Sequence, residues 1–169
     1  EPMLRFVQWA RTFTPSSPSN TWNIGDTSDP STRLAQSPLR AGSVFNFFRP
    51  GYVPPGNPLG SAGLVAPELQ ITNESSVVGY VNYLQTAVGN GLADLKVDYS
   101  AELARATDAN ALVDRMATLL AAGQLSAATL TTIQNAVATI TATTDAGKLN
   151  RIYASILLVL ASPEYIVLK

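Results

Sequence analysis

Ten of the eleven prolines in this 169-residue chain lie at or before Pro67, and the residues from Thr72 onward contain only Pro163. Proline has no backbone N–H to donate and pushes the preceding residue away from the helical conformation, so it interrupts helices and central strands. The prolines therefore place a boundary near residue 71. We expect long helices after this boundary and, apart from one helix at the start, only short helical turns before it.

Apolar residues recur every three or four positions in four stretches after residue 71, which is the spacing of amphipathic helices. The four apolar faces consist of Val77, Val81, Leu84 and Val88; Leu112, Val113, Met116, Leu119 and Leu120; Leu130, Ile133, Val137 and Ile140; and Leu149, Ile152, Tyr153, Ile156, Leu157 and Leu160. The residues expected to cap these helices are Thr72 or Asn73, Asp108, Ser126 and Thr144. We therefore predict a small helical bundle over residues 72–169.

Two shorter helices are also expected in this second part. One covers residues 99–106, and the other begins at "SPEY", residues 162–165, with Ser162 as its cap and Pro163 in its first turn. No stretch of the chain alternates between apolar and polar residues clearly enough to predict a strand.

The first part divides into a helix and an arm. The helix is predicted over residues 1–14 because these apolar residues follow the helical period: Met3, Phe6, Val7 and Ala10. Pro15 and Pro18 end it. Residues 15–71 carry many large apolar side chains without any period, and each gains about 1.5 to 3 kcal/mol on burial. Such a segment is not a solvated linker, so we predict an extended Pro/Gly-rich arm that wraps the bundle. The predicted fold is mainly α, with little or no β, in one domain.

The composition offers few groups for chemistry. The chain has no cysteine and no histidine, so it lacks disulfides, thiol nucleophiles, the commonest general base and the commonest transition-metal ligand. Its net charge is −1 and its lysines and arginines do not cluster, so we expect no nucleic-acid partner. The most apolar run, residues 152–161, is about half as long as a membrane-spanning helix. We predict no catalytic residue, no cofactor, no bound metal and no transmembrane segment.

One group of residues in the arm could bind a ligand or a partner: Arg40, Phe45, Phe47, Phe48, Arg49 and Tyr52. The two arginines could hold a carboxylate, a phosphate or a sugar acid through paired N–H donors. We favour the interpretation that they bond backbone carbonyls left unpaired by an irregular chain. The rings could form a platform for a glycan, but anchoring in a core or an interface is favoured because phenylalanine predominates.

Acidic residues suggest two further sites. Asp26 and Asp29, in "GDTSDPS", could bind calcium, since hard cations take several oxygens from a short acidic loop. Two carboxylates are few for such a site, and we expect Asp29 to cap a helical turn instead. Glu68 and Glu74 could form an acid pair, but the spacing does not determine how far apart they lie, and we expect Glu68 to be structural.

Several strings in the chain carry a resemblance to a known family. They are "QSPLR" at 36–40, "SVFNFFRPGYVPP" at 43–55, "GLVAPELQITNE" at 63–74, "RIY" at 151–153 and "SPEYIV" at 162–167. Together they resemble the carboxy-terminal part of the bacterial family known as "domain of unknown function 1800". The resemblance implies a longer helical protein with an export signal, and hence an amino-terminal portion outside this chain and a periplasmic, cell-surface or extracellular location. It supplies no established reaction and no catalytic residues.

Three functions are compatible with these observations. The leading hypothesis is a non-catalytic structural or interaction portion of an exported bacterial protein. The alternatives are part of an envelope or extracellular hydrolase whose catalytic groups lie in the missing amino-terminal portion, and a glycan-binding module. Each helix has a single apolar stripe and must also pack on other helices, so part of the arm should stay uncovered. We expect that strip to bind the protein's own amino-terminal portion or another protein subunit.

Overall fold

The structure is a computed structural model that describes residues 1–167. It confirms the prediction of a mainly α fold, and two three-residue strands are the β structure of the described residues. The chain divides into two compact units: Glu1–Phe6 with Ile24–Tyr83, and Val7–Asn23 with Leu84–Lys169. Helix α1 (Pro2–Thr12) and helix α3 (Glu74–Asn90) each contribute residues to both units. The division into helix, arm and bundle, and the wrapping of the bundle by the arm, stay predictions.

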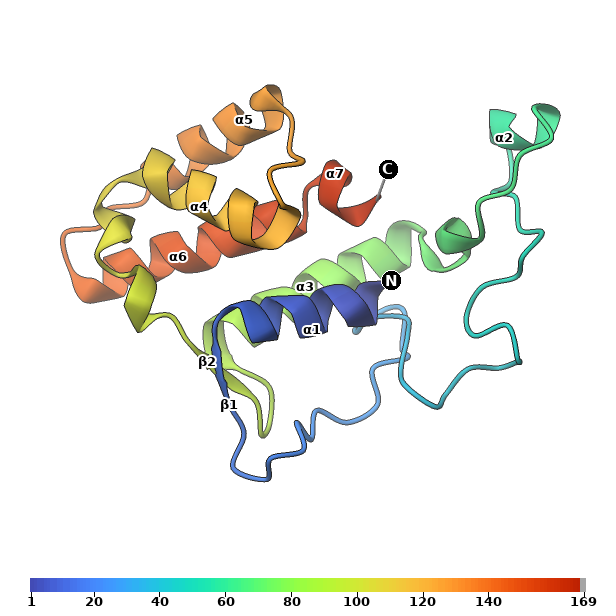
Figure 1. Ribbon diagram of the computed structural model, residues 1–169, viewed down its shortest axis with the longest axis horizontal. Helices are drawn as coiled ribbons and strands as arrows, with labels where there is room; N and C mark the ends of the chain where they lie inside the picture. Colours follow the sequence, from blue (N-terminus) through green and yellow to red (C-terminus); the bar gives the residue numbers. More distant parts are fainter. Residues whose placement is uncertain (168–169) are drawn as a thin grey trace. The chain divides into compact units, whose positions relative to one another are not determined.

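Three helices form the core of the second unit: α4 (Ala109–Ala121), α5 (Ala127–Ala138) and α6 (Asp145–Leu160). They pack against one another, as Figure 1 shows. Most of their large buried side chains come from the predicted apolar faces: Leu112, Val113, Met116, Leu120, Ile133, Val137, Ile152, Ile156 and Leu160. Val159 is also fully buried although it was not predicted, whereas the predicted Leu149 and Leu157 are half-buried. Each buried side chain contributes about 1.5 to 3 kcal/mol when it leaves water, so this core accounts for much of the unit's stability.

The predicted capping residues hold the first turns of the four long helices. Asp108 accepts hydrogen bonds from the backbone N–H groups of the first turn of α4, and Ser126 and Thr144 do the same for α5 and α6. At the start of α3, Asn73 and Ser76 cap each other reciprocally: the Asn73 side chain accepts from the Ser76 N–H at 3.0 Å, and the Ser76 hydroxyl accepts from the Asn73 N–H at 2.9 Å. These bonds satisfy N–H groups that have no partner within the helix.

The end of α6 differs from the expectation. Ser162 was predicted to cap α7 (Pro163–Ile166), but its hydroxyl donates to the carbonyl of Val159 at 2.8 Å. Ser162 does occupy the capping position before α7, with Pro163 in the first turn as predicted, but its side chain makes no capping bond. A serine between two helices can serve either end, and this hydroxyl bonds the end of α6.

Short elements complete the second unit. Strand β1 (Thr14–Ser16) pairs antiparallel with β2 (Lys96–Asp98). Three residues are too few to show alternation, which is why the sequence pattern did not reveal them. Residues 99–106 were predicted as one helix but form two single turns, η2 (Ser100–Glu102) and η3 (Arg105–Thr107).

The first unit is built on α3 and on the start of α1. Residues 27–37 pack closely here: the Thr27 hydroxyl donates to the Gln36 carbonyl at 2.6 Å, and the Gln36 side chain accepts from the Met3 N–H at 3.1 Å. A methyl group in place of the Gly79 hydrogen would lie 2.5 Å from the carbonyl oxygen of Pro30, so only glycine allows this approach. This unit also contains the single turns α2 (Pro58–Ser61) and η1 (Pro67–Ile71).

No helix of residues 1–167 is long and apolar enough to cross a membrane.

Candidate interaction surface

The predicted site residues lie on an irregular stretch of the first unit, which we call the exposed segment and define as residues 39–65. Hydrogen-bonded turns shape it: the Phe48 N–H donates to the Phe45 carbonyl at 3.2 Å, and the Tyr52 N–H donates to the Arg49 carbonyl at 3.0 Å. The Ala66 N–H donates to the Tyr52 carbonyl at 2.8 Å, which closes a loop over residues 52–66. The segment therefore has a defined shape although its regular secondary structure is limited to the short helix α2.

Large apolar side chains of the exposed segment face solvent. Leu39 is fully exposed, Val44 is 96% exposed and Phe45 is 56% exposed, and Leu64 and Val65 also expose more than half of their surface. Nine large apolar side chains are exposed in residues 1–167, and these five are the majority. Single exposed leucines are ordinary, but a concentration on one segment is typical of an interaction surface.

The aromatic candidates differ in exposure. Phe45 is largely exposed, whereas Phe47, Phe48 and Tyr52 are half-buried. A glycan platform needs several flat rings open to solvent at once, so the structure gives this hypothesis less support than an interface with one protruding ring.

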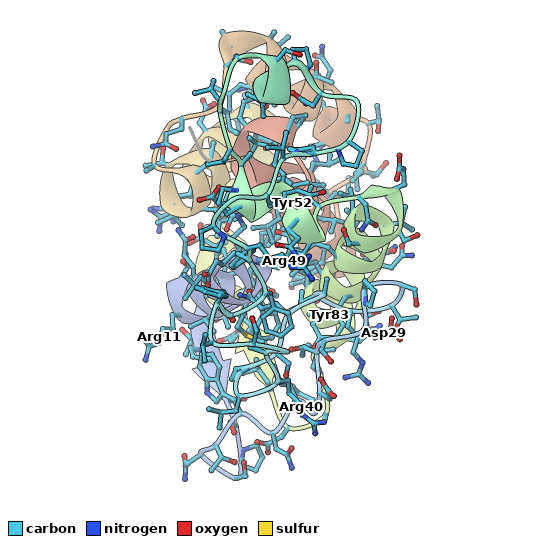
Figure 2. The ribbon with its side chains drawn as sticks, turned by 90° about the vertical axis from the view of Figure 1, so that its right-hand side faces the viewer. Arg11, Asp29, Arg40, Arg49, Tyr52 and Tyr83 are labelled. Atoms are coloured by element: carbon cyan, nitrogen blue, oxygen red, sulfur yellow. The ribbon has the colours of Figure 1, made fainter. Side chains whose placement is uncertain are left out.

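The two candidate arginines make fewer contacts than expected. Figure 2 labels Arg40 and Arg49 on the exposed segment. Arg40 Nη1 lies 3.4 Å from Asp26 Oδ2, and both side chains are well exposed, so this ion pair contributes little. Within the described part of the chain, the Arg49 guanidinium has no hydrogen bond or ion pair. Its backbone N–H donates to Gln70 Oε1, so the backbone is fixed while the charged group is free.

Other arginines of the chain bond backbone carbonyls, which is the role that we favoured for Arg40 and Arg49. Arg33 Nη1 donates to the Asp26 carbonyl at 2.6 Å. Arg151 donates to the carbonyls of Ile140 at 2.7 Å and of Ala106 and Thr107 at 3.1 Å. The prediction for Arg40 and Arg49 was wrong because turns within the exposed segment already pair part of its backbone.

The exposed segment overlaps three of the five strings that carry the family resemblance, those at 36–40, 43–55 and 63–74. Residues 1–167 match the family described as "Protein of unknown function (DUF1800)". The chain belongs to this family. No curated protein and no solved structure matches the chain.

In this DUF1800 chain, the two acidic residues considered for calcium binding serve local turns. Asp26 accepts from the N–H and hydroxyl of Ser28, and Asp29 accepts from the N–H and hydroxyl of Ser31. These bonds lower the pKa of both carboxyls. The largest cause is the Ser28 hydroxyl for Asp26 and the Ser31 hydroxyl for Asp29. In residues 1–167, no group of three or more acidic, histidine or cysteine residues is placed to hold a metal ion.

Two other carboxylates of the DUF1800 chain, Asp94 and Glu164, were not among the predicted site residues. Asp94 accepts from the hydroxyls of Ser17 and Ser19 and from the N–H of Asn23. Hydrogen bonds from these hydroxyls lower the pKa of Asp94 to about 2, and the bond from Ser17 has the largest effect. Since 77 residues separate Asp94 from Ser17, no local sequence signal could have shown this contact.

Glu164 joins α7 to the start of α5. Its Oε1 accepts from the Thr129 hydroxyl at 2.6 Å and from the Ser126 hydroxyl at 2.8 Å. The Thr129 hydroxyl is the largest cause that lowers the pKa of Glu164 to about 2. Like Asp94, this carboxyl is ionised at neutral pH and is a weak base. It is therefore better suited to holding α7 against the start of α5 than to proton transfer.

A third carboxylate is buried among arginines. Glu102, in η2, accepts from Arg115 Nε and Nη2, with the shortest contact at 3.1 Å, and lies 3.7 Å from Arg105 Nη1. Paired arginine donors compensate the removal of the charge from water. Every donor of this cluster comes from the same unit, and the cluster ties η2 and η3 to α4.

Proposed function

We propose that this chain is a non-catalytic structural and interaction portion of an exported bacterial protein, and that the exposed segment is the surface by which it binds another polypeptide. The observation that carries the proposal is the exposure of five large apolar side chains on one segment of defined shape. The other polypeptide is the protein's own amino-terminal portion or a further subunit.

The energetics of the exposed segment support binding. Leu39 and Val44 lie almost entirely in water, and each stands to gain about 1.5 to 3 kcal/mol when a partner covers it. The turns and the closed loop over residues 52–66 order the backbone in advance, which lowers the entropy lost on association.

The chemistry of the chain supports a non-catalytic role. With no histidine or cysteine, proton transfer would depend on carboxylates, lysines or tyrosines. The two carboxylates with the lowest pKa values, Asp94 and Glu164, already accept hydrogen bonds from neighbouring hydroxyls: Ser17 and Ser19 for Asp94, and Ser126 and Thr129 for Glu164. The exported location rests on the family resemblance alone, and fractionation of the source cells with an antibody to this chain tests it.

Photo-crosslinking tests the interaction surface directly. A photo-activatable phenylalanine analogue replaces Phe45 in the full-length protein, expressed in its own host. The matched control places the same analogue at Leu158, an exposed apolar position on α6. We expect a crosslink to polypeptide from position 45 at a yield well above the control. Equal and low yields at both positions would contradict the proposal.

The free guanidinium of Arg49 favours one alternative, in which the exposed segment borders the active site of an envelope or extracellular hydrolase. An arginine with free donors can bind an anionic substrate group. Activity screening of the full-length protein separates the two functions: Arg40→Ala and Arg49→Ala should reduce turnover if the arginines contact substrate. Unchanged turnover in both folded variants removes them from any active site.

A further inference from the structure

The exposed segment lies in the cationic part of an otherwise acidic chain. Residues 30–67 contain three arginines and no aspartate, glutamate or lysine, whereas the whole chain carries a net charge of −1. The remaining residues therefore carry a net charge of −4. Since binding surfaces match opposite charges, the apolar side chains of this segment are set up to meet a surface that carries carboxylates.

Arg49 is the group best placed to contact such a surface. Its backbone is fixed on both sides, by the N–H bond to Gln70 and by the carbonyl bond from Tyr52. Its guanidinium has all its N–H donors free within the described residues, whereas Arg40 already lies near Asp26. Arginine is also one of the residue types that are enriched at the positions that dominate the affinity of protein interfaces.

The conformation and exposure of Leu39 independently indicate that a partner covers this segment. It has φ of 60°, in the left-handed region that leucine rarely adopts, and its side chain is fully exposed. Both features are unfavourable for the chain by itself, and contact with a partner's apolar surface would offset them.

The geometry points to a polypeptide partner whose apolar surface is edged by a carboxylate that pairs with Arg49. This inference rests on the proposed function and specifies the chemistry of the partner. A lipid membrane fits less well, because anionic headgroups are recognised by clusters of about 4–8 lysines and arginines. The exposed segment has two.

Crosslinking from Val44 tests this chemistry, because Val44 is 96% exposed and lies close in sequence to Arg49. The analogue replaces Val44 in the full-length protein within its host, and crosslink yield is compared among Arg49 variants. We expect Arg49→Lys to retain the yield within about threefold and Arg49→Glu to lower it about tenfold or more, since a like charge opposes the partner carboxylate. The matched control is Arg11→Glu, an exposed arginine of the second unit, which should leave the yield unchanged.

The outcomes distinguish the proposed function from the pairing of Arg49 with a partner carboxylate. A Val44 crosslink to polypeptide that survives Arg49→Glu undiminished overturns the carboxylate pairing and leaves the proposed function standing. A wild-type chain that gives no crosslink, or crosslinks only to lipid or glycan, overturns both. A crosslink to a second copy of the chain identifies the partner, and the same charge comparison then applies. Once the crosslinked residue is mapped, changing the nearest partner carboxylate to arginine should restore the yield in Arg49→Glu, and failure to restore it contradicts the pairing.

Discussion

Arg151 of α6 links three segments of the second unit. Its guanidinium donates to the carbonyls of Ala106, Thr107, Ala138 and Ile140, which end η3 and α5. A planar group with five donors can satisfy several carbonyls at once, whereas the lysine ammonium cannot reach them in the same geometry.

We therefore expect Arg151→Lys to lower the free energy of unfolding by about 1 to 3 kcal/mol, because carbonyls lose charged donors. Urea unfolding measures the change, with Arg11→Lys on the exposed part of α1 as the matched control, expected to differ from wild type by less than about 0.5 kcal/mol. Equal effects of the two substitutions would show that the carbonyl contacts do not stabilise the fold.

The low pKa of Glu164 indicates how the free energy of unfolding depends on pH. Its folded pKa of about 2 lies below the ordinary value of 4.5, so it stabilises the folded state at pH values above about 4.5 and loses this effect as pH falls toward 2. Glu164→Gln should therefore destabilise the chain at pH 6 and have little effect at pH 2, measured by urea unfolding at both pH values. A destabilisation of the same size at both pH values would mean that ionised Glu164 is not the cause.

At the scale of elements, α3 contains a matched pair of glycines. A methyl group at Gly79 would lie 2.5 Å from the Pro30 carbonyl oxygen, whereas a methyl group at Gly89 would meet nothing within 4 Å. Alanine favours a helix over glycine by about 1 kcal/mol, so only the steric contact distinguishes the two positions.

We expect Gly79→Ala to lower the free energy of unfolding by about 1 to 3 kcal/mol through this clash. Gly89→Ala should raise it by about 0.4 to 1 kcal/mol. Thermal or urea unfolding of both variants measures the pair. If both substitutions stabilise the chain, residues 30–31 do not approach α3 as closely as the structure shows.

The long helices could be predicted from the sequence because their signals are local. Apolar spacing and the capping residues Asn73, Asp108 and Thr144 lie within one or two turns of the groups they act on. The strand pair and the Asp94 cluster could not be predicted, because they join residues about 80 positions apart through three-residue strands and single hydroxyl groups. The candidate residues of the exposed segment were proposed from composition, and their role as a site stays a prediction. The free guanidinium of Arg49 could not be predicted, because it depends on which carbonyls the turns leave available.

At the scale of the whole molecule, the chain combines well-packed helices with a segment that is ordered by turns and open to solvent. Helix α4 buries most of its apolar side chains and α6 buries Ile152, Ile156, Val159 and Leu160, whereas five large apolar side chains of the exposed segment face water. Amide groups in exposed turns open at low free energy, and amide groups in packed helices open only near global unfolding.

Hydrogen exchange of the backbone amides of residues 39–65 tests the central claim most directly. It is measured in the complex purified from the source cells and in the purified 169-residue chain, with the amides of α4 as the internal reference. We predict that the segment exchanges fast in the chain alone and at least about tenfold more slowly in the complex, because a bound polypeptide covers it, while α4 exchanges equally slowly in both. Equally fast exchange of the segment in both samples would contradict its role as an interaction surface.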